Sequence, residues 1–500
     1  MDILFIEPNA SNSYQALANK FSAIETPTWC LLLAGACRSA GLSVGILDAN
    51  AERLDPKAAA DRVKQINPRV VVVSCYGQNP NSSTPFFGSG ALLTKELKTQ
   101  YRGLIGFVGP HVAALPTEVL AKHPEIDFVL CNEGIIQIIN LFKVNLDLKS
   151  VNGIAYRRSG IVLLNPAEKI VSQVDLETVY TEYAWDLLPY DQEPLDLYRS
   201  HLWHADFDNL PRTPFAAIYT SLGCTFKCSF CMINMINRDS NEGEITASSF
   251  PKMRFFSAKW LKKEFDKLKQ MKVRTLRISD EMFYLNRTHY KPILDLLISE
   301  KYEFNMWVYS RVDTVRKEYI EEFKAAGINW ICLGIEAGDD QVRSGAFKGK
   351  FVSEKVEESV KTIRNAGIKV LANFIVGLPH DDAKTIDATL QMALNLNAEY
   401  ANFYPCMALP GSDLYLEAIK NNVELPTTYS GYGFLAYDCI PFPTDTLSSA
   451  QVLELRDKVF NEYVSNSEYQ KRFENNFGKD ALDVLNQLSS VKLKRQLLEN

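Results

Sequence analysis

The sequence predicts two successive α/β units, a doubly wound parallel sheet followed by a partial (β/α)6 barrel, and then a small, mostly helical C-terminal region. Short apolar segments rich in β-branched residues alternate with amphipathic segments through residues 1–150, which indicates a parallel sheet covered by helices. The same alternation returns on a larger scale in residues 211–420. Residues 151–210 break this rhythm and are predicted to be a linker, and residues 421–500 form the C-terminal region.

The first unit is expected to contain five strands and four helices. Its clearest strand is 68–77, because a run of four valines is typical of a strand buried on both faces. The other strands are expected at 2–8, 42–50, 104–112 and 127–134, and the helices at 28–41, 55–67, 91–101 and 117–124. Ligands of such sheets bind beyond the carboxyl ends of the strands. The connections 8–28 and 74–88 lie there and are long and rich in Asn, Ser, Pro and Gly, so we expect them to have a function.

The second unit is expected to contain about six βα repeats, too few for a closed eight-stranded barrel but enough for an open one. Its strands are expected at 215–223, 273–280, 304–313, 330–338, 369–379 and 400–411, and its helices at 257–272, 289–300, 317–328, 352–367 and 385–397. Barrels of this kind place their chemistry on the loops after the strands. Between the two units, residues 152–166 are predicted to form a hairpin and 186–198 an extended connector. Beyond the barrel, the Gly-, Tyr- and Pro-rich segment 429–443 precedes two or three predicted polar helices.

Composition and charge narrow the class of protein. The chain of 500 residues is 46% hydrophobic and has a formal net charge of −6 without a lysine-rich tail, which disfavours a nucleic-acid polymer as partner. It has no run of about 18 apolar residues, so no membrane span is expected. The segment MDILFIEPNA is predicted to be a first strand and not a secretion signal, and we expect a cytoplasmic protein. The ten cysteines are then expected to be reduced thiols or metal ligands.

Three of these cysteines, Cys224, Cys228 and Cys231, follow the first predicted barrel strand with the spacing Cys-x3-Cys-x2-Cys. The polar neighbours Lys227 and Ser229 disfavour a role as small buried hydrophobic residues, and a reducing compartment disfavours a disulfide. A structural zinc site usually has four protein ligands, and no fourth Cys or His lies nearby in the sequence. Three thiolates can instead hold three irons of a 4Fe-4S cluster and leave the fourth iron open to a chelating ligand.

The segment CTFKCSFC resembles the signature Cys-x3-Cys-x-aromatic-Cys of the radical S-adenosylmethionine (SAM) superfamily, in which SAM chelates the open iron. Four later segments, LRISDEMF, WICLGIEAGDDQV, NFIVGLPHDD and YPCMALPGSDLY, resemble the family at its later strand ends. The resemblance implies SAM contacts at Asp280, Glu281, Glu336 and Gly377. Arg311 in YSRVD is the candidate partner of the SAM carboxylate, with a surface ion pair as its alternative role. Asn373 departs from the family pattern, because it replaces the first glycine of the fifth-strand motif.

The first unit resembles the Rossmann-like, flavodoxin-like cobalamin-binding domain that precedes the radical domain in one branch of this superfamily. The resemblance is carried by residues 26–50, 71–77, 106–120 and 127–134. It implies cobalamin contacts at Tyr76, Gly109, Pro110, His111, Glu133 and Gly134. An ordinary loop tyrosine and a loop hydrogen-bonding histidine are the alternatives for Tyr76 and His111. None of the six histidines has an Asp two residues before it, so base-off cobalamin without a histidine ligand to cobalt is expected.

The resemblance implies a two-cofactor enzyme, similar to the cobalamin-dependent class B radical SAM methyltransferases. SAM would be cleaved reductively at the cluster to a 5′-deoxyadenosyl radical, and methylcobalamin would methylate an unactivated carbon of a small-molecule substrate. An electron donor such as flavodoxin or ferredoxin is implied, and the sequence assigns no further catalytic residue. A rearrangement, cyclisation or oxidation with the same cofactors is the first alternative. A corrinoid-binding carrier or sensor and a zinc-binding structural protein are the alternatives from other classes.

Overall fold

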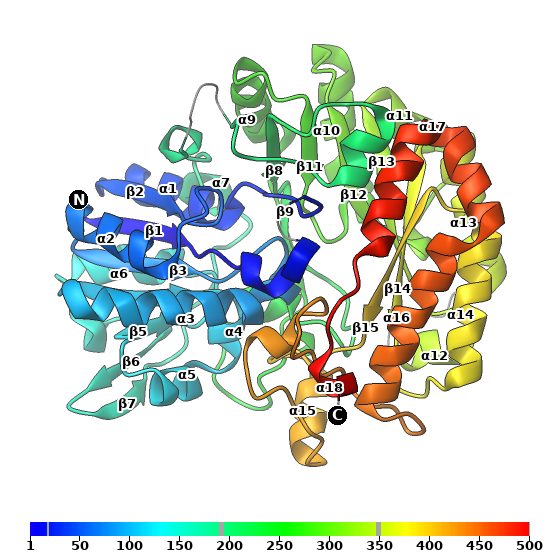
Figure 1. The fold of residues 1–500 in the computed structure, drawn as a ribbon. Helices are drawn as coiled ribbons and strands as arrows, with labels where there is room; N and C mark the ends of the chain where they lie inside the picture. Colours follow the sequence, from blue (N-terminus) through cyan, green and yellow to red (C-terminus); the bar gives the residue numbers. More distant parts are fainter. Residues whose placement is uncertain (18–19, 190–194, 347–351, 500) are drawn as a thin grey trace.

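The computed structural model of the chain describes residues 1–17, 20–189, 195–346 and 352–499. Two large sheets lie side by side in it, one in the front unit (blue and cyan in Figure 1) and one in the barrel (green and yellow). The orange and red C-terminal helices pack along the outer side of the barrel (Figure 1). Residues 190–194 of the predicted connector lie outside the described residues.

The front sheet confirms the predicted doubly wound architecture. Its parallel strands lie in the order β2-β1-β3-β4-β5. These strands are β1 (Ile3–Glu7), β2 (Val44–Asp48), β3 (Val70–Ser74), β4 (Leu104–Val108) and β5 (Phe128–Leu130). Every residue of β3 is buried, as its valine run predicts, because helices cover both faces of the sheet. The strand order reverses between β1 and β3, so the loops after these two strands border the crevice in which such sheets bind ligands.

The predicted hairpin after the front unit is present, and it extends the same sheet. β6 (Ile154–Arg158) pairs antiparallel with β5, and β7 (Ile161–Leu164) pairs antiparallel with β6. The sheet therefore continues past residue 150 into the predicted linker. Burial explains this extension, because the first three residues of β6 are almost fully buried against the front-unit core.

The barrel sheet is open, as predicted. Its six strands lie in the order β15-β14-β13-β12-β11-β8, and each neighbouring pair is parallel. They are β8 (Phe215–Ile218), β11 (Thr275–Ile278), β12 (Asn305–Arg311), β13 (Ile328–Glu336), β14 (Lys369–Val376) and β15 (Tyr400–Pro405). The side of the barrel between β8 and β15 faces the front unit and the C-terminal segment (Figure 1).

The predicted strand 215–223 is wrong in one respect, because the chain bends after β8 and begins a second strand. This strand, β9 (Ser221–Cys224), pairs antiparallel with β10 (Lys252–Phe255), which the sequence did not indicate. The Asp280 carboxylate accepts hydrogen bonds from the N–H groups of Thr220 (2.5 Å) and Ser221 (3.0 Å) and so fixes the bend to the end of β11.

Helices cover both faces of the front sheet. Ile3 and Phe5 of β1 pack with residues of α1 and α6, and Leu4 and Ile6 pack with residues of α2 and α3. The front-unit helices are α1 (Thr28–Ser39), α2 (Pro56–Ile66), α3 (Ser83–Gln100), α4 (Pro110–Ala114), α5 (Pro116–Lys122) and α6 (Ile135–Lys143). α3 begins eight residues before the prediction. Its first turns contain Gly88 and Gly90, which indicate a loop in the sequence but allow the helix to approach Tyr429 and β4 closely.

The remaining helices follow the barrel strands and complete the C-terminal region. The short connecting helices are α7 (Leu176–Val179) and α8 (Leu202–Ala205). The barrel helices are α9 (Ala258–Gln270), α10 (Arg287–Glu300), α11 (Ile320–Ala325), α12 (Asp340–Gly345), α13 (Ser353–Asn365), α14 (Ala383–Leu396) and α15 (Asp413–Lys420). The C-terminal helices are α16 (Ser449–Ser465), α17 (Ser467–Ser490) and α18 (Gln496–Glu499), as the sequence predicts. Among the described residues, no helix combines the length and the apolar character that crossing a membrane requires.

The C-terminal segment returns from α17 to the space between the two units (Figure 1). The Gln15 side chain of the front unit donates hydrogen bonds to the carbonyl oxygens of Leu435 (2.7 Å) and Lys494 (3.2 Å). Arg495 donates to both oxygens of Asp457 on α16 (2.9 and 3.0 Å). These contacts attach the C-terminal segment to the front unit and to α16 at once.

Asp48 at the end of β2 predicts a pH dependence of stability. Burial raises the pKa of Asp48 to about 6, although the Ala51 N–H and the Tyr198 hydroxyl donate to it. The folded state therefore binds this proton more tightly than the unfolded chain. The stability from Asp48 is complete below about pH 4 and is lost as the pH rises through about 6.

We expect Asp48→Asn to raise the free energy of unfolding by about 2 kcal/mol at pH 7 and by less at pH 5. Urea unfolding of both proteins at the two pH values measures this difference. A variant that is less stable than the wild type at pH 7 would contradict the assigned pKa direction.

Candidate functional site

The three motif cysteines lie together after the bend of β9. Cys224 ends the strand, and Cys228 and Cys231 lie on the loop that follows. The Cys231 N–H donates to the Cys228 carbonyl (3.1 Å), and the Cys224 N–H donates to the Asn234 side chain (2.9 Å). Burial raises the pKa of the Cys231 thiol, and the neighbouring Cys228 and Cys224 raise it further, so the three sulfurs lie within electrostatic reach of one another.

A cavity of about 330 Å³ opens onto these cysteines at the carboxyl ends of the barrel strands, and we call it the cysteine cavity. Three predicted SAM-contact residues, Glu281, Arg311 and Glu336, line it from the ends of β11, β12 and β13. Asn373 lines it from β14. The structure thus gathers chemically active side chains from separate strands at the end of the barrel that carries chemistry.

Arg311 is held beside the cysteines by two contacts. Its Nε and Nη2 atoms donate to the Asp313 carboxylate (2.9 and 2.8 Å), and its guanidinium lies 3.8 Å from the centre of the Phe226 ring. Burial lowers the pKa of Arg311, but Asp313 and the thiols of Cys228 and Cys224 raise it overall. The buried Nη1 has no hydrogen-bond partner among the described residues, so one donor remains for an anionic ligand.

Glu336 has a strained backbone at the cavity. Its φ of +73° lies in the left-handed region, which is costly for a residue with a side chain. The pairing of β13 with β14 shifts register between Gly334 and Glu336. Such bulges redirect a side chain next to active sites, and here the bulge coincides with the position of Glu336 on the cavity wall.

Asp280 and Gly377 lie outside the walls of the cysteine cavity. Asp280 is fully buried, and besides the two backbone N–H groups it accepts the hydroxyls of Thr220 and Ser221 (both 2.6 Å). Gly377 directly follows β14 with a φ of +86°, and a Cβ atom there would collide with Val452 of α16. Asp280 therefore fixes the strand that leads to the cysteines, and Gly377 allows the contact between β14 and α16.

The predicted cobalamin-contact residues of the front unit are buried in its interior. Tyr76 stacks on Trp29 with 4.2 Å between ring centroids. His111 contacts Thr84 through Nδ1 (3.1 Å), and burial lowers the pKa of His111 to about 3, so its ring is neutral. Glu133 forms a buried ion pair with Arg254 of β10 (2.7 Å). Gly109 and Pro110 begin α4, and Gly134 caps α6. These six residues do not line the cysteine cavity, nor do they line a second cavity of about 790 Å³ that adjoins it.

Other front-unit residues line the cavities instead. Ser13 and Tyr14 come from the loop after β1, and Asn79, Asn81 and Ser82 come from the loop after β3. Sequence reasoning did not select these side chains, but it did select both loops by their length and composition.

A second cavity of about 790 Å³, which we call the large cavity, adjoins the cysteine cavity. The two cavities share wall residues from all three parts of the chain, including Tyr14 of the front unit, Tyr309, Asn373 and Tyr404 of the barrel, and Phe434 of the C-terminal region. The cavity at the cysteines therefore adjoins a chamber that the front unit, the barrel and the C-terminal segment line together.

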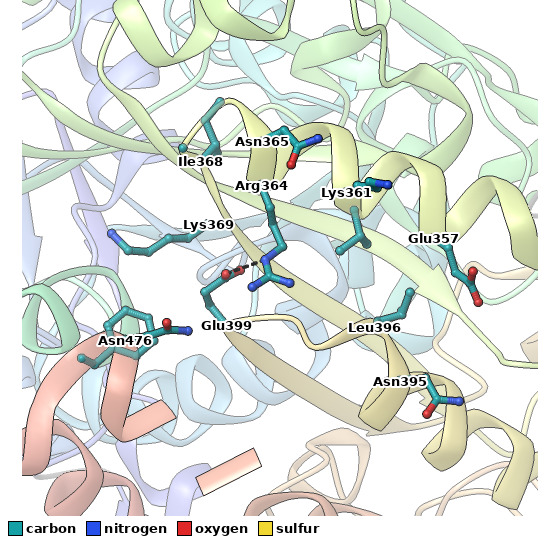
Figure 2. Close-up of a pocket in the computed structure, with 13 residues that line it drawn as sticks. Glu357, Lys361, Arg364, Asn365, Ile368, Lys369, Asn395, Leu396, Glu399 and Asn476 are labelled. Carbon is teal, nitrogen blue, oxygen red and sulfur yellow. Dashed lines mark hydrogen bonds and ion pairs between the residues drawn. The ribbon is translucent and has the colours of Figure 1, made fainter. Parts of the chain in front are cut away.

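A third hollow, of about 650 Å³, lies at the opposite end of the barrel strands (Figure 2). Lys369 begins β14 there, and Glu399 precedes β15. Figure 2 shows the ion pair of Glu399 with Arg364 of α13, in which Nε lies 2.9 Å from Oε1. No cysteine lines this hollow, so we place the candidate site at the carboxyl ends of the strands.

Two family models match the two units that the geometry brings together. The model of the radical SAM superfamily matches residues 218–393, which contain the cysteine loop, Glu281, Arg311 and Glu336. The model of the B12 binding domain matches residues 14–137, which contain the front-unit loops at the cavities. The chain belongs to the radical SAM superfamily. It is an enzyme of the branch that carries a B12-binding domain in front of the radical SAM domain.

Relatives of this radical SAM enzyme include methyltransferases and cyclases. It is 25% identical to the uncharacterized methyltransferase PH0819 of Pyrococcus horikoshii over 78% of both chains. It is also 25% identical to the anaerobic magnesium-protoporphyrin IX monomethyl ester cyclase of Rubrivivax gelatinosus, over 93% of this chain and 77% of that one. Its fold is similar to the radical SAM methyltransferase TsrM of Kitasatospora setae, solved with cobalamin and a [4Fe-4S] cluster, with a TM-score of 0.66, 15% identity and coverage of 98% and 100%.

The residues of this radical SAM enzyme fit the cofactors that its family implies. Three soft thiol ligands on one loop share a cavity with a buried, incompletely paired guanidinium. In the described parts of the chain, no three Cys, His, Asp or Glu side chains form a site for a single metal ion. Two front-unit loops line the large cavity, which adjoins the cysteine cavity. The large cavity lies beyond the strand ends of the front unit, where sheets of this kind bind their ligands.

Proposed function

We propose that this enzyme holds a 4Fe-4S cluster through Cys224, Cys228 and Cys231, binds base-off cobalamin at the strand ends of the front unit, and methylates an unactivated carbon of a small-molecule substrate. The observation that carries the proposal is that the three cysteines and the front-unit loops after β1 and β3 line the same cavity. When bound, the cluster supplies the electron that cleaves SAM to a 5′-deoxyadenosyl radical, and cobalamin supplies the methyl group.

The chain's own residues would bind and orient SAM beside the cluster. The free Nη1 donor of Arg311 would bind the SAM carboxylate, while Asp313 holds the other edge of the guanidinium. Glu281 and Glu336 would accept hydrogen bonds from the SAM amino group and ribose. Phe226 and Phe230 line the same cavity and would exclude water from the cluster. Asp280 would act as a positioning residue, because it fixes β9 and not the ligand.

The front unit would bind the corrin through the loops after β1 and β3. Tyr14, Asn79 and Ser82 extend from these loops into both cavities. Tyr76, Gly109, Pro110, His111, Glu133 and Gly134 would support these loops and border the nucleotide tail from inside the unit. His111 contacts Thr84 through Nδ1 and lines neither cavity, which supports a cobalt without a histidine ligand.

In domain terms, the proposed cobalamin-binding domain covers residues 1–150 and the proposed radical SAM core covers residues 211–420. The hairpin of the intervening segment 151–210 adds to the front sheet, and the helices of the region 421–500 pack along the outer side of the barrel. An external one-electron donor such as flavodoxin or ferredoxin would reduce the cluster.

A substrate-independent experiment tests this proposal. The anaerobically reconstituted protein is incubated with cob(I)alamin, a reductant and SAM that carries a deuterated methyl group. We expect 5′-deoxyadenosine and trideuteromethyl-cobalamin, both measured by mass spectrometry. Formation of 5′-deoxyadenosine without labelled methylcobalamin would contradict methyl transfer, while the proposed radical cleavage of SAM would still hold. Formation of neither product would contradict both parts.

A cyclisation or related oxidation with the same cofactors is the second candidate. The similarity to the Rubrivivax cyclase favours it, because that match covers 93% of this chain. In the labelling experiment, labelled methylcobalamin supports the methyltransferase. Formation of 5′-deoxyadenosine without labelled methylcobalamin supports the cyclisation or oxidation.

A further inference from the structure

The barrel-side wall of the large cavity contains a hydrogen-bonded network that the cofactors do not explain. Asn402 of β15 donates through Nδ2 to Asn373 Oδ1 (3.2 Å) and to the Tyr404 hydroxyl (3.0 Å). Asn373 and Tyr404 also line the cysteine cavity. The network therefore lies where the two cavities join, on the wall that the barrel contributes.

The direction of these hydrogen bonds determines what the wall offers to a ligand. The carbonyl oxygen of Asn373 and the oxygen of Tyr404 both accept from Asn402. The Asn373 amide nitrogen and the Tyr404 hydroxyl hydrogen then remain as donors, and among the described residues none accepts from that nitrogen. The wall thus presents donors and favours a ligand group that only accepts hydrogen bonds.

Arg277 adds positive charge to the same wall. It is buried, and its guanidinium lies 4.6 Å from the ring centre of Trp307 and 5.4 Å from that of Tyr309. Its Nη1 donates to Glu25 and to the Gln78 carbonyl (2.8 Å). Its Nε and Nη2 atoms are buried without a partner among the described residues. The guanidinium therefore keeps unsatisfied donors although one edge is paired.

The charge of the whole large cavity points in the same direction. Five Lys or Arg side chains line it against two carboxylates, although the chain has a net charge of −6. The basic residues are Arg277, Arg456, Lys492, Lys494 and Arg495. Aromatic rings form much of the remaining barrel wall, among them Trp307, Tyr309 and Tyr404. Such a wall fits a flat apolar body that carries an anionic oxygen group.

We propose that this wall is the substrate subsite and that it takes an aromatic, carboxylate-bearing molecule, whose carboxylate accepts from Asn373 and Tyr404. Arg277 stabilises the negative charge, and the rings of Trp307 and Tyr309 contact the aromatic body. A dianionic phosphate fits less well, because the Glu25 carboxylate already lies on the same guanidinium. This inference rests on the proposed function, in which the front-unit loops after β1 and β3 receive cobalamin.

A matched pair of probes tests the inference. Isothermal titration of the anaerobically reconstituted holoprotein compares 4-biphenylcarboxylate with 4-biphenylmethanol, which has a similar shape and no charge. We expect the carboxylate to bind at least about tenfold more tightly, since hydrogen bonds to a charged group are the stronger ones. Equal affinities, or no binding of either probe, would overturn the inference.

Two variants test whether the preference for the carboxylate probe comes from the hydrogen-bonded network of Asn373, Asn402 and Tyr404. Asn373→Leu and Tyr404→Phe remove one donor each and are expected to reduce the ratio of the two affinities severalfold. A general loss of structure would weaken both probes equally and would leave this ratio unchanged. Arg364→Met, in the hollow at the other end of the barrel (Figure 2), is the matched control and should keep the wild-type ratio. A ratio that is unchanged in both network variants would overturn the assignment.

The same preparations distinguish this inference from the proposed function. Formation of 5′-deoxyadenosine from SAM is measured in parallel without any probe. SAM cleavage without a carboxylate preference would overturn the substrate class alone. A preference for the carboxylate probe without SAM cleavage would overturn the proposed function, while the assignment of the subsite would still hold.

Discussion

Replacing Cys228 with alanine is expected to remove the iron–sulfur cluster and to reduce the formation of 5′-deoxyadenosine by more than about 100-fold, since even outer partners of metal ligands contribute 10–100-fold. The three cysteines share one loop and one cavity, so two remaining thiols cannot hold three irons. The effect is measured by the iron and sulfide content, by the absorbance at about 400 nm and by the rate of SAM cleavage. Cys224→Ala and Cys231→Ala should behave in the same way.

Cys37→Ala is the matched control for these variants. Cys37 is also a free thiol, but it is buried in α1 of the front unit and lines neither cavity. This variant should bind as much iron as the wild type. Full iron content in any of the three loop variants would show that the cluster has other ligands.

Replacing Arg254 with methionine is expected to lower the free energy of unfolding by about 3–5 kcal/mol, because a buried charge would lose its partner. Arg254 and Glu133 are almost completely buried and lie 2.7 Å apart. Arg254 also donates to the Val171 carbonyl (2.9 Å) and to the Asn237 side chain (3.1 Å). The pair thus joins the front unit to β10, which pairs with the strand that leads to the cysteines.

The double variant Glu133→Gln with Arg254→Met should lose less stability than Arg254→Met alone. It removes both charges, and the cost of burying an unpaired carboxylate then disappears. Chemical denaturation of the three proteins measures the two differences. Equal losses in the single and double variants would mean that the side-chain volume of Arg254, and not its charge, stabilises this junction.

Patterns that depend on neighbouring residues could be predicted from the sequence. The valine run of β3 and the alternation of strands and helices fix both sheets, because burial on two faces requires apolar β-branched segments. The spacing of the three cysteines brings them to one cavity for a similar reason, since a short loop after a strand keeps its residues close. Glu281, Arg311 and Glu336 lie at or just after the ends of three neighbouring strands and line the same cavity as the cysteines.

Features that depend on distant contacts could not be predicted in this way. The antiparallel pair β9–β10 exists because Asp280, in the loop after β11, fixes the bend before Ser221. Tyr76 follows β3 as a ligand contact would, but Trp29 from α1 covers its ring. The side chains that line the chamber from the front unit, such as Asn79, lie on irregular loops, and their orientation depends on the barrel opposite them.

The electron paramagnetic resonance spectrum of the reduced protein, recorded before and after SAM is added, tests the central claim most directly. Three cysteine ligands leave one iron of the cluster open, so SAM should bind to that iron and change the spectrum. A signal of a reduced 4Fe-4S cluster that shifts on addition of SAM is the predicted result. A spectrum that SAM leaves unchanged, or reconstituted protein without such a signal, would contradict the account.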